Sequence, residues 1–559
     1  MSAPFKRVSK SLTTAISSSL FILVLTAIQL PARSQPTPSP PPTAGPSSTI
    51  AQTPQPETDA IAQQRAQLEA ALATVENIGG LSTNADAHLQ IKALIGIAEE
   101  FSKLGDNARS LEVLEKALTV AEGSSPNRYL HSLQSIAPYY RYINADNVLL
   151  SRLQAALQVD ESLTHQERKS ALSYLATGYM HVEDADALQQ GLSAILNQLE
   201  SVEDIGGSTR YLVRDIADSY GRLPDAAAAN AGLSQLLEIA LKNLEIPTPD
   251  PYGNEVFFRR GQAYVLGEVA KAYALQANTS EATTLLKQAV ELLEGEDSFY
   301  IAQAVPTVAE AHGYLPNAAA AQTGLATLMD FTINHSNESQ LKQLESAAAI
   351  AIAYSQIGDR EQAQQTLDTA AQLVNELNEP GHQMMFLHKL AEGYKAIGNV
   401  AAQQAKIQEA FAVIDTLTPG EDIYSQALYK LSEGYSQVTD DAIAQNLFDQ
   451  LETFMRQIDA PEYGRAGALG ELALVAQRRG NDENAQRLLT EAVTQLSPDE
   501  NLALWRQRSA IRRIITGYSH LPNAAIKQAG LEQIRALAPT LVEAESVPEI
   551  EDMIVRAYL

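Results

Sequence analysis

Residues 350–373 read IAIAYSQIGDREQAQQTLDTAAQL, and this stretch decides the fold. It opens with aliphatic and small residues and reaches an aromatic at Tyr354, and after Gly358 its apolar residues recur at three- and four-residue spacing. Such spacing gives a helix one apolar face. Glycine adopts the left-handed conformation that ends a helix, and the side chain of Asp359 is suited to cap the next one. The stretch therefore predicts two helices joined by a tight turn.

The same pattern recurs along most of the chain. Its aromatic position falls at Phe101, Tyr140, Tyr179, Tyr220, Tyr273, His312, Tyr354, Tyr394, Tyr435, Ala476 and Tyr518. Most steps between these positions are 39 to 42 residues, and one is 53. A fixed period indicates a repeat array, in which each unit packs on its neighbours. We therefore expect an all-α fold, a right-handed α-solenoid of about eleven stacked helical hairpins with a period of about 40, over residues 59–547.

A second kind of turn occurs in three of the units. It is marked by a proline followed by Asp or Asn, at Leu223-Pro224-Asp225, Leu315-Pro316-Asn317 and Leu521-Pro522-Asn523. Proline ends the first helix, and the polar residue is placed to cap the second. The same units carry a glycine inside the second helix, at Gly232, Gly324 and Gly530. A glycine there costs about 1 kcal/mol against alanine, so we expect close helix contact at these positions.

These units resemble the tetratricopeptide repeat. The small, tyrosine, alanine, leucine and alanine positions of that family are matched at Ala351, Tyr354, Ala363, Leu367 and Ala370, and again at Ala270, Tyr273, Ala282, Leu286 and Ala289. With the tyrosine replaced, they are matched at Ala473, Ala476, Ala485, Leu489 and Ala492. The period exceeds the family's 34 residues, and Trp505, the only tryptophan, lies between units.

The resemblance implies a place for a partner. In tetratricopeptide repeats the first helices line a concave surface that holds a peptide or a helix of another protein. The positions that face this concave surface can be located in each unit by their offset from the aromatic. Here they are Arg214, Asp218, Lys271, His388, Glu392, Lys395, Tyr429 and Glu433. We expect a protein or peptide partner there.

A long connection explains the step of 53 residues. We expect a loop over residues 245–261, and long loops inside compact structure are often functional. Phe257, Phe258, Arg259 and Arg260 place two aromatics and two cations together, residue types that are common in binding hot spots. The alternative is that both phenylalanines begin the next helix and pack inward.

The N-terminus has the pattern of an export signal. Residues 1–34 combine a basic start, the apolar run LFILVLTAI at 20–28 and small residues at a cleavage site, which predicts a secretory signal peptide. An uncleaved signal anchor is the alternative. Residues 35–58 hold eight prolines and are expected to form a disordered linker. We expect the body of the protein in the periplasm or outside the cell, with no membrane span once the signal is removed. At the other end, residues 548–559 predict a helix that caps the last hairpin.

Composition argues against several functions. The net charge is −27, with 67 acidic against 40 basic residues, and such a surface repels nucleic acid. The absence of cysteine excludes disulfides and thiolate chemistry. His382 and His388 are six residues apart, which is poor spacing for one metal on one helix face. Catalytic and phosphate-binding motifs are absent. We therefore expect no enzyme activity, no metal and no cofactor.

The sequence favours a scaffold that binds another protein outside the cytoplasm. Two alternatives stay open. One is an envelope enzyme, or a subunit of one, whose helices cradle a glycan or a peptide. The other is a structural spacer with no dedicated ligand.

Overall fold

The computed structural model describes residues 59–77, 84–123, 126–157, 163–200, 209–244, 255–293, 303–334, 340–416, 430–431, 433–457, 464–496, 504–542 and 547–558. All of them belong to the compact unit Glu57–Leu559, one of the two units into which the chain divides. The predicted signal peptide and linker lie outside the described residues. None of the described helices is long and apolar enough to cross a membrane.

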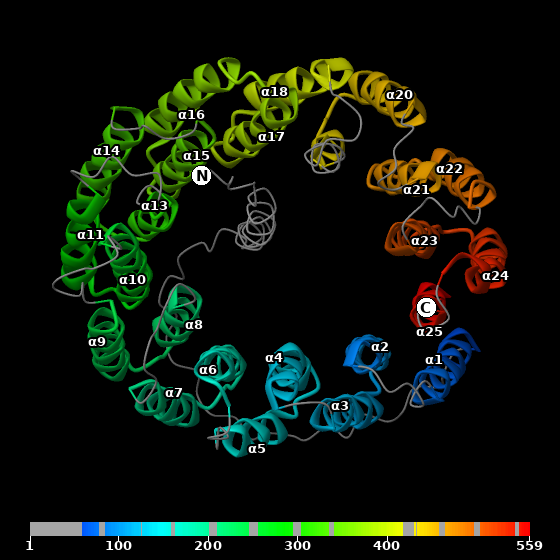
Figure 1. Cartoon of the computed structure of the whole chain (residues 1–559), viewed down its shortest axis with the longest axis horizontal. Helices are drawn as coiled ribbons and strands as arrows, with labels where there is room; N and C mark the ends of the chain where they lie inside the picture. Colours follow the sequence, from blue (N-terminus) through cyan, green and yellow to red (C-terminus); the bar gives the residue numbers. More distant parts are fainter. Residues whose placement is uncertain are drawn as a thin grey trace, which may run out of the picture. The chain divides into compact units, whose positions relative to one another are not determined.

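The described residues form helices and connecting turns, which confirms the predicted all-α fold (Figure 1). The first helices of the hairpins are α2 (Asn84–Lys103), α4 (Pro126–Tyr142), α6 (His165–Tyr179), α8 (Thr209–Gly221), α10 (Glu255–Leu275), α13 (Val305–Gly313), α15 (Gln340–Gln356), α17 (Pro380–Ala396), α21 (Gly464–Gln477) and α23 (Leu504–Ser519). The helical residues around 430–436 take the same place between α17 and α21. The exact number of hairpins stays a prediction.

The second helices alternate with the first along the chain. They are α3 (Asn107–Glu122), α5 (Asp146–Ala156), α7 (Ala185–Leu199), α9 (Ala226–Lys242), α11 (Thr279–Leu293), α14 (Ala318–Asn334), α16 (Arg360–Asn375), α18 (Val400–Ala412), α20 (Asp441–Gln457), α22 (Asp482–Thr494) and α24 (Ala524–Leu541), with a short 3₁₀ helix, η1 (Ile414–Thr416), after α18. Helix α1 (Asp59–Asn77) precedes the first hairpin, and α25 (Val547–Tyr558) follows the last.

The helices stack in two layers. First helices pack against the first helices of neighbouring hairpins, as α8, α10 and α13 do, while second helices such as α7 and α9 pack against each other. Figure 1 shows α6, α8 and α10 in one layer and α7, α9 and α11 in the other. Each residue of the first layer therefore lies beside the equivalent residue of the next unit, one repeat away in the sequence.

Both predicted kinds of turn are present. Gly358 has a φ of +83°, and the next residue, Asp359, accepts a hydrogen bond from the backbone N–H of Gln362 at 3.1 Å. The turns at Gly105, Gly398 and Gly480 are built in the same way. In the proline-marked turns, Asp225 and Asn523 cap α9 and α24. The caps satisfy backbone donors that a helix start leaves without a partner.

The glycines inside the second helices sit under aromatic rings, as expected. A Cβ atom on Gly232 would collide with the ring of Tyr220, and one on Gly530 would collide with Tyr518. His312 covers Gly324 in the same way. The repeat pattern within the sequence did not reveal a fourth pair, Tyr179 over Gly191. In each case the aromatic stands twelve residues before the glycine, so the missing side chain is what lets the ring fit between the two helices.

The two ends of the described chain meet. Helix α25 packs against α23 and α24, and it also packs against α1 and α2 at the start of the array. Its residues Ile550 and Ile554 are fully buried, and Glu551 accepts a hydrogen bond from Arg535 of α24 at 2.8 Å. Figure 1 shows α25 beside α1 and α2. The C-terminal helix therefore covers the first hairpin as well as the last.

One expectation about a loop is wrong. Helix α10 begins at Glu255, so the second part of the stretch expected to form a loop over 245–261 is helical. Phe258 packs against the core, whereas Phe257 stays 42% exposed beneath the guanidinium of Arg260, 5.2 Å from the ring centre. The alternative, that the phenylalanines begin the next helix, is correct, although only Phe258 turns inward. Val256 and Phe258, which both pack against the core, continue the apolar face of α10 and extend the helix.

Candidate functional site

Charged side chains gather on the first layer at a single position of the repeat. Asp218, Lys271 and Glu310 each stand two residues before the aromatic of their own hairpin, on α8, α10 and α13. Stacking brings them side by side: Lys271 Nζ lies 3.6 Å from Asp218 Oδ1 and 2.9 Å from Glu310 Oε1. Arg214, Asp215 and Glu268 surround this row, and we call the six residues the Lys271 cluster.

The cations of the Lys271 cluster are held by several groups at once. Arg214 donates to Asp215 Oδ1 at 2.8 Å, and Asp215 also accepts a hydrogen bond from the Ser173 hydroxyl of α6. Lys271 lies 5.4 Å from the centre of the Tyr314 ring, within the range of a cation–π contact. Burial lowers the pKa of Lys271, but Glu310 and Asp218 outweigh this effect and leave it above its ordinary value. The lysine therefore stays charged.

Among the carboxyl groups of this cluster, Glu268 has the pKa that lies furthest from its ordinary value. Burial raises its pKa to about 8, although Lys271 and Arg214 draw the pKa down. Glu310 and Asp218 add to the rise because they are negatively charged. Glu268 therefore holds a proton near neutral pH, and a cation brought close to it would favour loss of that proton.

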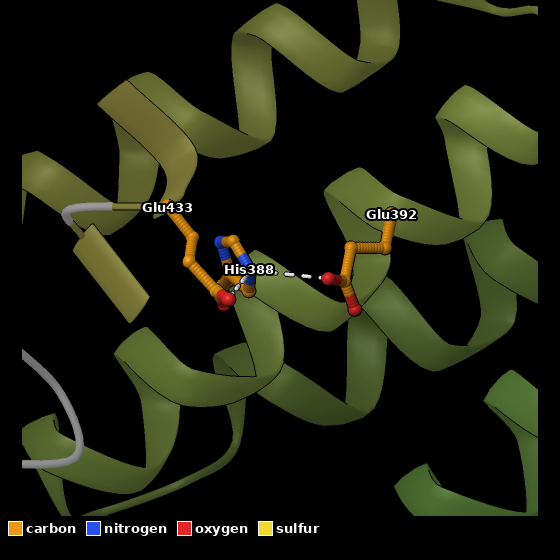
Figure 2. Close-up of side chains that lie close together, drawn as sticks. All are labelled: His388, Glu392 and Glu433. Atoms are coloured by element: carbon orange, nitrogen blue, oxygen red, sulfur yellow. Dashed lines mark ion pairs between the residues drawn. The ribbon is translucent and has the colours of Figure 1, made fainter. Parts of the chain in front are cut away.

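A second cluster lies further along the first layer (Figure 2). His388 and Glu392 are one turn apart on α17, and Glu433 comes from the next first-layer segment. His388 Nε2 lies 3.3 Å from Glu392 Oε1 and 3.4 Å from Glu433 Oε2. Lys430 Nζ lies 2.7 Å from the same oxygen of Glu433. We call these four residues the His388 cluster.

The histidine of this cluster is the buried member. Its side chain is 3% exposed, against 25% for Glu392 and 20% for Glu433. Burial lowers the pKa of His388, but the nearby Glu392 and Glu433 outweigh this effect and leave the pKa above its ordinary value. The pKa of Glu392 is correspondingly lowered: burial raises it, and His388 more than offsets that rise. Of the described residues, His388, Glu392 and Glu433 are the group whose donor atoms could hold a metal ion.

The structure brings six of the twelve predicted residues into these two clusters. Three of them, Arg214, Asp218 and Lys271, meet in one cluster, and His388, Glu392 and Glu433 meet in the other. Lys395 is exposed near the end of α17 and belongs to neither. Tyr429 lies outside the described residues. Phe257, Phe258, Arg259 and Arg260 form the first turns of α10, where Arg260 donates to the Gln303 side chain at 3.0 Å.

Sequence reasoning missed four members of the clusters. They are Asp215, Glu268, Glu310 and Lys430. A usable signal was present, because Glu310 occupies the same offset from its aromatic as Asp218 and Lys271. Asp215, Glu268 and Lys430 share another offset, five residues before the aromatic. Reading both offsets in every unit would have identified all four.

Comparisons with known proteins find distant matches among solved structures alone. No protein-family model matches the sequence, and no curated protein is significantly similar to it. Among solved structures, a putative kinesin light chain of Podosopora anserina with nearly identical TPR-like repeats is 20% identical, with 36% of this chain and 97% of that one covered and a TM-score of 0.24.

Two further solved structures cover more of this chain at lower sequence identity. The Rap protein complexed with competence and sporulation factor is 16% identical, with 66% of this chain and all of that chain covered (100%) and a TM-score of 0.23. The APC/C hetero-tetramer Cut9-Hcn1 is 13% identical, with 89% and 95% covered and a TM-score of 0.20. The described hairpins themselves show the helical repeat array, with the turns and close glycine contacts expected of tetratricopeptide-like units.

Proposed function

We propose that the array is a non-catalytic scaffold outside the cytoplasm and that a partner protein places a basic segment on the Lys271 cluster. The observation that carries this proposal is the make-up of the cluster. It sets four carboxyl groups, Asp215, Asp218, Glu268 and Glu310, against two cations, across three consecutive first helices. Even with Glu268 protonated near neutral pH, three carboxylates outnumber the two cations, and this excess of negative charge favours a positively charged ligand.

The exposure of these side chains supports access by a partner. Glu310 is 43% exposed and Asp218 26%, so both present oxygens to solvent while Lys271, at 15%, holds them in place. Glu268 can become negatively charged when the partner binds, because a lysine or arginine of the partner would lower its pKa and favour release of its proton. Binding of a basic segment should therefore strengthen as pH rises toward and past 8.

The test is capture of the partner by two matched variants. Asp218→Asn with Glu310→Gln removes the two solvent-accessible carboxylates of the Lys271 cluster in the first layer, whereas Asp482→Asn with Glu483→Gln removes two exposed acids from α22 in the second layer. Cross-linking in an envelope extract, followed by quantitative mass spectrometry, should recover one protein with the wild type and the α22 variant. The first-layer variant should lose it. Equal recovery by both variants would contradict the proposal, and absence of any stoichiometric partner would favour the structural spacer.

The location outside the cytoplasm rests on residues 1–34. A basic start followed by a short apolar run is the pattern that directs a chain to export. N-terminal sequencing of the protein isolated from its native cells should find a start near residue 35 in a fraction outside the cytoplasm. An intact N-terminus in a membrane fraction would indicate the signal anchor, and an intact N-terminus in the cytoplasm would contradict export.

A further inference from the structure

We propose that His388, Glu392 and Glu433 form a binding site for a divalent transition-metal ion such as Zn²⁺. This goes beyond the scaffold function and does not depend on it. The proposal begins with the buried histidine. Nε2 of His388 points between the two carboxylates at ion-pair distance, yet it makes no well-formed hydrogen bond to a described residue, although its side chain is only 3% exposed (Figure 2). A buried polar atom without a hydrogen bond costs about 1–3 kcal/mol, which an ion between the three groups would offset.

The distances suit an ion more closely than they suit hydrogen bonds. Donor atoms about 2.1 Å from a zinc ion in tetrahedral geometry are ~3.4 Å apart. Nε2 of His388 lies 3.3 Å from an oxygen of Glu392 and 3.4 Å from an oxygen of Glu433. All three donor atoms lie within 4.8 Å of one another. Small movements of the two glutamate side chains would complete the arrangement.

The ligand chemistry narrows the class of ion. One imidazole nitrogen and two carboxylate oxygens suit Zn²⁺ and similar first-row ions better than the oxygen-only shells that Ca²⁺ and Mg²⁺ prefer. A neutral imidazole with two carboxylates carries a charge of −2, which balances the ion. Three protein ligands leave at least one coordination position for water, as in open zinc sites.

The position of the ligands in the fold also favours a metal. His388 and Glu392 lie on one turn of α17, a spacing of four residues that places both on the same helix face. Glu433 occupies in its own segment the offset that Glu392 occupies in α17, 41 residues earlier. A metal here would therefore join two neighbouring units across the first layer.

The ammonium group of Lys430 would compete with a metal ion for Glu433, and this competition makes the proposal testable. Its Nζ lies 2.7 Å from the oxygen of Glu433 that faces the histidine. A metal ion must displace this ammonium group or share the oxygen with it, and the two cations repel each other at this range. Lys430→Gln should therefore tighten metal binding by roughly threefold or more, whereas a merely structural ion network would gain no affinity for metal from this change.

The experiment is titration of the metal-free full chain with Zn²⁺ by isothermal calorimetry. The wild type should bind one equivalent. His388→Gln and Glu433→Gln should each weaken binding at least about tenfold, since even changes to groups that only orient a ligand cost 10- to 100-fold. Circular dichroism checks that each variant is folded. Glu392→Gln, at a more exposed position, serves as a third variant if either of the others unfolds.

A matched control lies on the same helix. His382 also pairs with a single glutamate, Glu379, but it is 28% exposed and has no second carboxylate in its ion pair. His382→Gln should leave zinc binding unchanged. The proposal is overturned if the wild type binds no stoichiometric zinc, or if His382→Gln weakens binding as much as His388→Gln does.

Discussion

The ring of Tyr220 lies over Gly232, in the space that a Cβ atom at that glycine would occupy. This contact joins α8 to α9 and explains why a residue unfavourable to helices stands inside the second helix. Tyr220 is 1% exposed, so the ring has no open space into which it could move. The same ring-over-glycine contact recurs in the hairpins of Gly191, Gly324 and Gly530, so it is a repeated packing feature of the array.

Gly232→Ala is expected to destabilise the protein by about 1–3 kcal/mol, the usual cost of overpacking a core. The gain in helix propensity is smaller than this cost in the hairpin. Thermal unfolding followed by circular dichroism measures the effect. Gly123→Ala is the control, because a Cβ there would meet its nearest atom at an ordinary 3.6 Å. Replacing Tyr220 by Leu in the same chain should recover part of the loss, and an unchanged midpoint for Gly232→Ala would contradict the packing described.

His312 lies over Gly324 where other hairpins have a tyrosine, and this substitution costs folding stability. Both of its ring nitrogens lack a hydrogen-bond partner among the described residues, and burial lowers its pKa to about 4. The unfolded chain takes up a proton near pH 6.5, whereas the folded chain does so only near pH 4. Since the unfolded state binds more protons in that window, stability falls as pH drops through it.

His312→Phe should therefore stabilise the protein by about 1–2 kcal/mol at neutral pH, because it removes two unsatisfied polar atoms. The advantage should grow between pH 7 and pH 4. Comparing unfolding midpoints of variant and wild type at pH 5 and pH 8 tests both statements. His520→Phe, at an exposed position, controls for the loss of a histidine. Equal differences at the two pH values would show that His312 titrates normally.

The sequence was informative where a structural feature is local. The left-handed glycine at 358 and the cap at Asp359 follow from backbone preferences within a few residues, and both were predicted correctly. The glycine at 232 also marked a close contact, because a helix-breaking residue recurring at one offset needs a reason. These features require only the period of the repeat and the geometry of one hairpin.

Contacts between units were harder to predict. His388 and Glu433 stand 45 residues apart, and metal spacing along one helix cannot show that stacking joins them. The predicted loop over 245–261 ended too late because charged and aromatic residues together suggested a binding loop, while the apolar face of α10 continues through them. The packing of α25 on α1 depends on how far the whole array turns, which is the sum of small rotations at every interface.

Glu268 should make the stability of the wild type depend on pH in the direction opposite to His312. Its pKa is about 8 in the folded protein against an ordinary value of 4.5, so the folded state binds more protons between these values. Stability is therefore lost as pH rises from about 4.5 to 8. Glu268→Gln removes this loss and should be more stable than the wild type by about 1–3 kcal/mol at pH 8.5, with little difference at pH 5.

Unfolding midpoints of the Glu268→Gln variant and the wild type across pH 5 to 9 provide the measurement. The control is Glu291→Gln, which removes a glutamate whose side chain is 60% exposed in a surface ion pair. Its difference from the wild type should stay constant with pH. A constant difference for Glu268→Gln as well would place its pKa in the ordinary range and remove the support it gives to binding of a basic segment.

Helix α25 should couple the two ends of the array. Ile554 is fully buried where α25 packs against α1, α2, α23 and α24. Ile554→Asp buries a charge without a partner, so α25 should leave its site. Amide hydrogen exchange should then lose protection both in α24, its neighbour in sequence, and in α1, at the opposite end of the described chain. Ile350→Asp is the matched control, since Ile350 is equally buried in α15 and its loss should affect the neighbours of α15 only. If protection in α1 survives Ile554→Asp unchanged, the contact between the ends contributes no stability, and the array behaves as an open stack.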